Sequence, residues 1–236
     1  MSLFVIADLH LPFGVNKPMD IFGGWDNYVQ RLEYNWKSVV KPEDTVVIPG
    51  DFCWALKLQE SLEDFKFLES LPGQKIMSKG NHDLWWSSMK KNEDFVTANG
   101  FTSVKFLHNN CYAYGRTGIC GTRGWISENG EPADLKVLNR EAGRLETSIS
   151  AAKAQGLEPI VFLHYPPVYI HGDNEPMLEV LRRHGIKQCF YGHIHGKEKH
   201  SMAIRGVKDG IEYHLVSADY LQFMPLDITK FVQSDE

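Results

Sequence analysis

The stretch KIMSKGNHD at residues 75–83 decides the fold, because it joins a short apolar run to a polar turn. Short continuous apolar runs indicate strands buried on both faces, as in a sheet covered by helices. The same junction recurs at other places along the chain. These further junctions are Leu3–Ala7 before Asp8-Leu9-His10, Thr45–Ile48 before Pro49-Gly50-Asp51, Ile160–Leu163 before His164-Tyr165, and Gln188–Tyr191 before Gly192-His193-Ile194-His195.

Helical periodicity fills the intervals between these runs. Apolar residues at steps of three and four mark one stripe from Trp25 to Val39, a second from Leu58 to Leu68 and a longer third from Leu135 to Ala152. A shorter helix is expected over Pro176–His184, with a proline in its first turn and Gly185 after its end. Alternating strands and helices predict an α/β architecture with right-handed crossovers.

Two parts of the chain lack this alternation. Val104–Thr122 predicts two or three strands with short turns, and meandering strands are expected over Ala203–Ile204, Glu212–Ser217 and Gln222–Leu226. No linker, low-complexity tract or internal repeat interrupts residues 1–236, so we expect a single domain. The Leu11–Gly24 segment, rich in proline and glycine, directly follows the first polar turn, and the sequence leaves open whether it is a lid.

Composition disfavours several classes of protein. Hydrophobic residues make up 43% of the 236 residues and charged residues 23%, which is typical of a globular protein with a sizeable core. A net charge of -5 without a lysine or arginine run disfavours long nucleic acid as a partner. No apolar run reaches the roughly 18 residues of a membrane span, and the amino terminus lacks a basic signal segment, so we expect a cytoplasmic protein. The sequence leaves the oligomeric state open.

The polar turns carry residue types that bind transition metals. In open α/β sheets the carboxyl ends of the strands converge on one rim, so side chains far apart in sequence meet there. Neutral imidazole and carboxylate, without thiolate, suit Mn, Fe or Zn, and also Co or Ni. Asp8 and His10 stand two residues apart and point to the same side of an extended backbone, as do His193 and His195. Each motif is weak alone, and their joint occurrence at successive strand ends predicts a metal site.

With these motifs the sequence resembles the calcineurin-like metallophosphoesterase superfamily, in a phosphodiesterase-like branch rather than the protein phosphatases. The match lies in Asp8-Leu9-His10, Gly50-Asp51, Gly80-Asn81-His82-Asp83, His164 and Gly192-His193-Ile194-His195. The resemblance implies an α/β four-layer sandwich of two mixed β-sheets flanked by helices. It also implies two divalent cations, one held by Asp8, His10, Asp51 and His195 and the other by Asp51, Asn81, His164 and His193, with Asp51 bridging.

The reaction that the resemblance implies is hydrolysis of a phosphate ester. A hydroxide that bridges the two cations would attack phosphorus in line with the leaving oxygen. His82 lies outside the ligand set, and we expect it to protonate the leaving alkoxide or to bind a phosphoryl oxygen. Asp83 is expected to orient the His82 ring and to raise its basicity.

Departures from the family pattern bear on the substrate. Protein Ser/Thr phosphatases of the superfamily carry Gly-Asp-x-x-Asp-Arg-Gly, whereas residues 50–56 read GDFCWAL and lack that arginine. We therefore favour a small phosphodiester or a nucleotide-like substrate. Arg123 is a candidate replacement clamp, because its planar guanidinium matches phosphate oxygens. Trp54 and Tyr165 are candidates to stack on a base.

Other functions remain as alternatives. A metal-dependent nuclease is one of them, and a phosphomonoesterase or protein phosphatase is another. Assays on DNA, small diesters and monoesters distinguish them. A non-catalytic scaffold is the least favoured, because none of the expected ligand positions is eroded.

Overall fold

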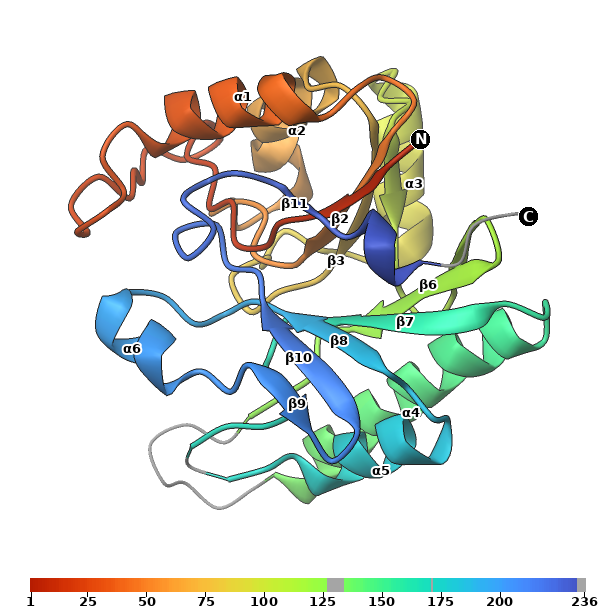
Figure 1. The fold of residues 1–236 in the computed structure, drawn as a ribbon. Coiled ribbons are helices and arrows are strands. Elements are labelled where there is room, and N and C mark those ends of the chain that lie inside the picture. The colour runs from red at the N-terminus through yellow and green to blue at the C-terminus, as the bar shows by residue number, and fades with distance from the viewer. Residues whose placement is uncertain (127–133, 171, 233–236) are drawn as a thin grey trace.

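The computed structural model describes residues 1–126, 134–170 and 172–232, and these residues form two β-sheets packed face to face (Figure 1). The strand order is β11-β1-β2-β3-β4 in the first sheet and β5-β6-β7-β8-β10-β9 in the second. The edge strands β11, β5 and β9 run antiparallel to their neighbours, and the others run parallel, so both sheets are mixed. The strands are β1 Leu3–Val5, β2 Thr45–Pro49, β3 Gln74–Ser78, β4 Val104–Phe106, β5 Tyr112–Tyr114, β6 Thr117–Thr122, β7 Glu158–Leu163, β8 Gln188–Tyr191, β9 Gly206–Lys208, β10 Ile211–Leu215 and β11 Leu226–Asp227.

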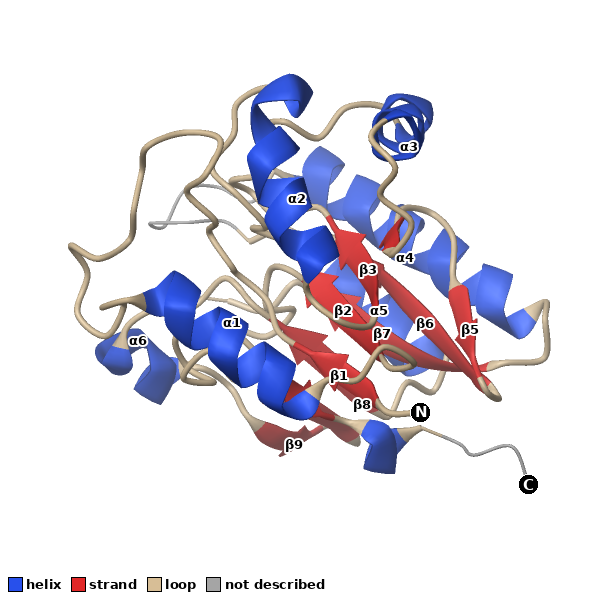
Figure 2. Cartoon of the chain, turned by 90° about the horizontal axis from the view of Figure 1, so that it is seen from above, coloured by secondary structure: helices blue, strands red, loops and turns tan. Residues whose placement is uncertain are grey.

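Helices cover the outer faces of both sheets, which gives the four layers that the family resemblance implies (Figures 1 and 2). Helices α1, α2 and α3 pack on the first sheet, and α4 and α5 pack on the second. No helix in the described ranges is long and apolar enough to cross a membrane. The helices are α1 Tyr28–Val39, α2 Leu62–Ser70, α3 Met89–Ala98, α4 Leu135–Lys153, α5 Glu175–Arg183 and α6 Lys197–Met202, with short 3-10 turns at Leu58–Ser61 and Thr229–Phe231.

Alternating residues of each central strand fill two different apolar layers. In β1, Val5 lies in the layer between the sheets, and Phe4 packs outward against the helices of the first sheet. In β7, Phe162 faces the other sheet, and Val161 packs outward with α4 and α5. Burial on both faces is why these strands appear in the sequence as continuous apolar runs rather than as alternating patterns.

The sequence analysis missed one helix, and two of its expected strands need correction. The hydrophobic pattern does not predict helix α3, because the polar run KKNED separates Met89 from Phe95 and Val96 and leaves no continuous stripe. Its start is set locally, since the Ser88 side chain accepts a hydrogen bond from the Lys91 amide. Ala203–Ile204 is not a strand, and Gln222–Leu226 contributes only Leu226 to β11 because the preceding residues form a turn.

The two sheets meet at the rim formed by the carboxyl ends of their parallel strands. The Ala7 amide donates to the Val216 carbonyl at 2.8 Å, and Ala7 forms a parallel bridge with Ser217 just beyond β10. The segments that follow β1, β2, β3, β7 and β8 therefore come together along this rim. These are the segments that carry the expected metal ligands.

Candidate metal centre

The turns at the rim approach one another so closely that two glycines are required. A Cβ atom on Gly80 would lie 2.1 Å from Asp51 Oδ1, and one on Gly192 would lie 2.5 Å from Asp8 Oδ2. Any side chain at either position would displace a candidate ligand. The glycines thus allow the backbone of one strand end to lie directly against the carboxylate of another.

Four of the expected ligands have left-handed backbone conformations. The φ angles are +61° at Asp8, +46° at His10, +53° at Asp51 and +71° at His193. Such conformations cost about 1–3 kcal/mol each in residues other than glycine, and they persist where the surrounding structure imposes them. Their concentration at one rim indicates a functional site.

Hydrogen bonds across the turns fix these conformations. The Asp8 amide donates to the Gly50 carbonyl at 3.0 Å, and the His193 amide donates to Asp8 Oδ2 at 2.9 Å. The His82 amide donates to Asp51 Oδ1 at 2.8 Å. The carboxylates of Asp8 and Asp51 are therefore each held by the backbone of another strand end.

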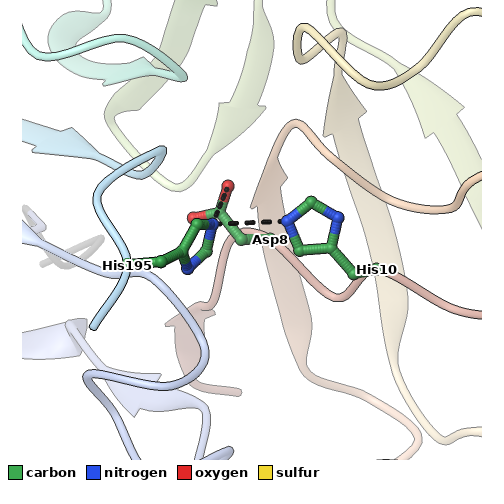
Figure 3. A group of neighbouring side chains, drawn as sticks. All are labelled: Asp8, His10 and His195. Atoms are coloured by element: carbon green, nitrogen blue, oxygen red, sulfur yellow. Dashed lines mark hydrogen bonds and ion pairs between the residues drawn. The ribbon is translucent and has the colours of Figure 1, made fainter. Parts of the chain in front are cut away.

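One group of donor atoms consists of Asp8, His10 and His195, which Figure 3 shows side by side. His10 Nε2 lies 3.3 Å from His195 Nε2, and His195 Nε2 lies 3.7 Å from Asp8 Oδ1. The candidate ligand atoms of these three residues all lie within 4.8 Å of one another. The His10 ring is held in this direction by stacking on Trp54, with ring centroids 4.6 Å apart.

A second group of donor atoms adjoins the first. Asp8, Asp51 and His164 also offer ligand atoms within 4.8 Å of one another. Asn81 Oδ1 lies 2.6 Å from His164 Nε2 and 2.9 Å from His193 Nδ1. His164 Nδ1 lies 3.1 Å from the Pro49 carbonyl, which can accept its proton and leave Nε2 free to bind a cation.

Burial favours the neutral form of three imidazoles in this cluster. It is the first cause that lowers the pKa of His10 and of His164 well below the usual range, and it lowers the pKa of His193 to about 3. Burial would also lower the pKa of His195, but the charges of Asp8 and Asp219 outweigh it and raise that pKa. Neutral imidazole is the form that binds a metal.

The carboxylates show the opposite effect. Burial raises the pKa of Asp8 to about 6, and burial together with the charges of Asp83 and Asp8 raises the pKa of Asp51 well above its usual range. Crowded carboxylates facing neutral imidazole nitrogens lack positive charge, which divalent cations would supply. The residues present therefore fit a site for transition-metal cations with nitrogen and oxygen ligands.

Asp83 has a different place from the one that the sequence suggested. Its carboxylate does not lie behind the His82 ring; it accepts hydrogen bonds from the backbone amides of Asp51 at 2.9 Å and Gly80 at 2.7 Å. It also accepts bonds from the Phe52 amide at 2.9 Å and from Trp85 Nε1 at 3.0 Å. Asp83 is therefore a buried carboxylate that joins the turns after β2 and β3.

His82 lies at the exposed edge of the cluster. One side of its ring packs near Trp54, with centroids 4.5 Å apart, and His10 lies 5.6 Å away. This partial desolvation, followed by the charges of Lys17 and His195, lowers its pKa to about 4. Its imidazole is thus beside the candidate ligands and open to solvent.

The candidate base-stacking residues turn out to support the ligands. Tyr165 is buried, with its ring 4.3 Å from that of His193. Trp54 stacks on His10, and Lys17 Nζ lies 3.4 Å from its ring centroid. Lys17 belongs to the Leu11–Gly24 segment, so this segment lies beside the His10 side of the cluster.

Arg123 lies next to the cluster through its backbone. Its carbonyl accepts hydrogen bonds from the amides of His164 at 3.2 Å and Tyr165 at 2.9 Å. Its guanidinium points elsewhere, with Cζ 5.0 Å from the Trp125 ring centroid and an amino nitrogen 3.8 Å from Glu141 Oε1. The structure therefore directs this side chain towards α4 rather than towards the candidate ligands.

Asp219 is a member of the site that sequence reasoning missed. Its Oδ1 lies 3.0 Å from His195 Nδ1, and its Oδ2 accepts the Gly196 amide at 2.8 Å. A carboxylate behind a ligating imidazole fixes the ring and raises its basicity. Asp219 stands just beyond β10, so the rule that strand ends carry the site could have found it.

Replacing Asp219 with alanine is expected to weaken metal binding about 10–100-fold, the usual effect of losing such a partner. Competition with a chelating dye would measure the metal dissociation constants. Asp209→Ala, in an exposed turn of the same sheet, is the control and should leave metal binding unchanged. Equal affinities in wild type and Asp219→Ala would show that His195 does not depend on this contact.

Comparison with known proteins gives one family and a shared fold. A model of calcineurin-like phosphoesterases matches residues 1–197. A protein of unknown function, AQ665, from Aquifex aeolicus aligns over 98% of this chain and 97% of its own, at 15% identity and a TM-score of 0.54. The phosphopantetheinyl hydrolase of Mycobacterium tuberculosis aligns over 92% and 88%, at 16% identity and a TM-score of 0.51.

The protein TT1561 of Thermus thermophilus aligns over 83% of both chains, at 14% identity and a TM-score of 0.51. At such identities these structures show the fold alone. A search of curated proteins finds no match.

Proposed function

The chain belongs to the calcineurin-like phosphoesterase family, and from this premise we propose that it hydrolyses a small phosphodiester or nucleotide-like ester with two divalent cations. At the level of the family it is a metal-dependent phosphoesterase with buried Asp and His clusters that form a metal site. The proposal adds the number of cations, their ligands and the class of substrate. Mn, Fe or Zn are the metals we favour, with Co or Ni acceptable to the same ligands.

One cation is assigned to the first group of donors and the second to the adjoining group. The ligands of the first are Asp8, His10, Asp51 and His195, and those of the second are Asp51, Asn81, His164 and His193. The observation that carries this assignment is a shared oxygen. Asp51 Oδ2 lies 3.7 Å from His10 Nε2 and 3.5 Å from His164 Nε2, so one carboxylate oxygen faces a histidine of each group.

When bound, such a pair of cations lowers the pKa of water and neutralises the charge of the phosphoryl oxygens. The chain's own residues orient the ester and exchange protons with it. His82 is held beside Asp51 by its amide and presents its ring at the exposed edge of the cluster. We assign to it the protonation of the leaving alkoxide or a hydrogen bond to a phosphoryl oxygen.

The favoured substrate class follows from what surrounds the cluster. The arginine of the protein phosphatase motif is missing from residues 50–56, which disfavours a protein phosphatase. The net charge of -5 disfavours long nucleic acid, since phosphate backbones bind through many basic contacts. A small diester needs neither feature.

The test is a hydrolysis assay on protein reconstituted with Mn, Fe, Co, Ni or Zn. The panel should contain bis(4-nitrophenyl) phosphate, 4-nitrophenyl phosphate, cyclic nucleotides, DNA and a phosphopantetheinyl ester, the last because one protein of the same fold carries that name. We expect the diesters to be hydrolysed faster than the monoester and DNA. Failure to hydrolyse any of them, in protein shown to carry two cations per chain, would refute the proposed function.

A further inference from the structure

A buried glutamate on α4 lies near three arginine side chains, whose combined positive charge exceeds its single negative charge. Glu141 is fully buried. Its Oε1 accepts a hydrogen bond from Arg144 Nη1 at 2.6 Å, and its Oε2 accepts one from the Thr122 hydroxyl at 2.8 Å. Arg123 and Arg140 each lie 3.8 Å from the same Oε1, too far for a hydrogen bond. One carboxylate thus faces three guanidinium groups, and Arg144 already satisfies the oxygen that the other two approach.

Arg123 is the cation of this group with the least compensation. Its Nε atom is buried and has no hydrogen-bond partner within the part of the chain that the structure describes. Its side chain is 19% exposed, and it packs on the face of Trp125, which fixes the plane of the guanidinium. A planar guanidinium that is held in place and has N–H groups without acceptors is suited to bind a phosphate or carboxylate.

The group is continuous with the metal centre. The Arg123 carbonyl accepts the amide of the candidate ligand His164, so β6 and β7 place the two residues side by side. From Arg123 the contacts run through Trp125 to Tyr165, at 5.6 Å between ring centroids, and from Tyr165 to His193 at 4.3 Å. Along this path of contacts, two aromatic rings lie between the Arg123 guanidinium and the His193 ring. Helix α4 packs along β6 (Figures 1 and 2).

We propose that Arg123, supported by Arg144 and Glu141, binds a second anionic group of the substrate beside the metal centre. The two intervening rings place this group on an organic linker rather than on an adjacent phosphate. The substrate class is then a phosphate ester with a further phosphate on its organic part, such as a diester of a phosphorylated nucleoside. This identification of the anion with part of a substrate rests on the proposed function, whereas the anion site itself does not.

Binding of inorganic phosphate to the metal-free protein tests the anion site alone. Without cations, the metal centre lacks the positive charge that would bind phosphate, and the Arg123 variants identify the part of the calorimetric signal that belongs to the Arg123 site. We expect binding to the wild type and a loss of about 10–100-fold in Arg123→Gln, the range for a hydrogen bond to a charged group. Arg123→Lys keeps the charge but loses the forked pair of N–H donors, so its phosphate affinity should lie between those of the wild type and Arg123→Gln.

Arg140→Gln is the matched control, because Arg140 lies at the same 3.8 Å from Glu141 Oε1 but is half exposed on the surface of α4. Its phosphate affinity should stay within about twofold of the wild type. Thermal melting of each variant establishes that it is folded. Unchanged binding in folded Arg123→Gln, an equal loss in Arg140→Gln, or no phosphate binding by the wild type would overturn the anion site.

A pair of diesters then tests the substrate class. In metal-loaded protein, the ratio of kcat/KM for 4-nitrophenyl thymidine 5′-phosphate with a 3′-phosphate to that without one should fall about 10–100-fold in Arg123→Gln. An unchanged ratio would overturn the substrate class while leaving the hydrolase intact. If neither these diesters nor any member of the earlier panel is hydrolysed, the proposed function fails, and the phosphate titration still decides the anion site.

Discussion

Replacing Asp51 with asparagine is expected to remove both cations and to reduce hydrolysis at least roughly 10³-fold. Asp51 Oδ2 faces Nε2 of both His10 and His164. Asp8 also belongs to both groups of donors, but on His164 its Oδ1 faces Nδ1, the nitrogen that lies against the Pro49 carbonyl. Asparagine lacks the negative charge, and its amide NH2 group at the Oδ2 position would point N–H bonds towards the imidazole lone pairs. Elemental analysis of the dialysed protein and a diester assay measure the two losses.

The fold should survive this substitution. The metal-free wild type buries the Asp51 carboxylate beside Asp83 and Asp8, and this burial and repulsion raise the pKa of Asp51. Removing that charge should leave the melting temperature of the metal-free variant no lower than that of the metal-free wild type. Asp44→Asn is the control, because Asp44 is a buried carboxylate at the opposite end of β2, and it should keep both cations. Two cations retained in Asp51→Asn would contradict the shared-oxygen assignment.

Replacing His82 with alanine should leave both cations bound and reduce kcat by roughly 10²–10⁴-fold, the range for a positioned acid or base. His82 contributes its amide, not its ring, to the Asp51 carboxylate, and alanine keeps that amide. The exposed ring is therefore the part that is lost, and it is the part we assign to the ester. Metal content and kcat, measured on the same preparation, separate binding from turnover.

Leu84→Ala is the matched control for this loop. Leu84 is 60% exposed two residues after His82, and its side chain lies outside the cluster. This control should keep both its cations and its kcat. A His82→Ala enzyme that turns over normally would remove His82 from the mechanism, and one that loses its cations would make His82 a ligand.

The fold could be predicted where the hydrophobic pattern and the topology act together. The runs at Thr45–Ile48, Ile160–Leu163 and Gln188–Tyr191 are all strands, since burial on both faces makes the whole run apolar. Parallel pairing then brings their carboxyl ends to one rim, which is why residues as distant as Asp8 and His195 meet. Helix α3 escaped prediction because its start depends on the Ser88 cap and not on a stripe.

What could not be predicted was the partner of each side chain. Asp83 stands next to His82 in the sequence, but its backbone directs the carboxylate to the amides of Asp51 and Gly80. Adjacency along the chain does not fix direction where the backbone turns sharply. Arg123 was identified as a cation near the site, yet only the position of buried Glu141 on α4 shows where its guanidinium points.

Two cations that share Asp51 at the rim between the sheets are the basis of the proposed chemistry. Anomalous diffraction from crystals grown with Mn²⁺ measures their presence and positions most directly. We expect two peaks per chain, one among Asp8, His10, Asp51 and His195 and the other among Asp51, Asn81, His164 and His193. A single peak, or peaks away from these residues in protein that hydrolyses the diester, would contradict the shared site.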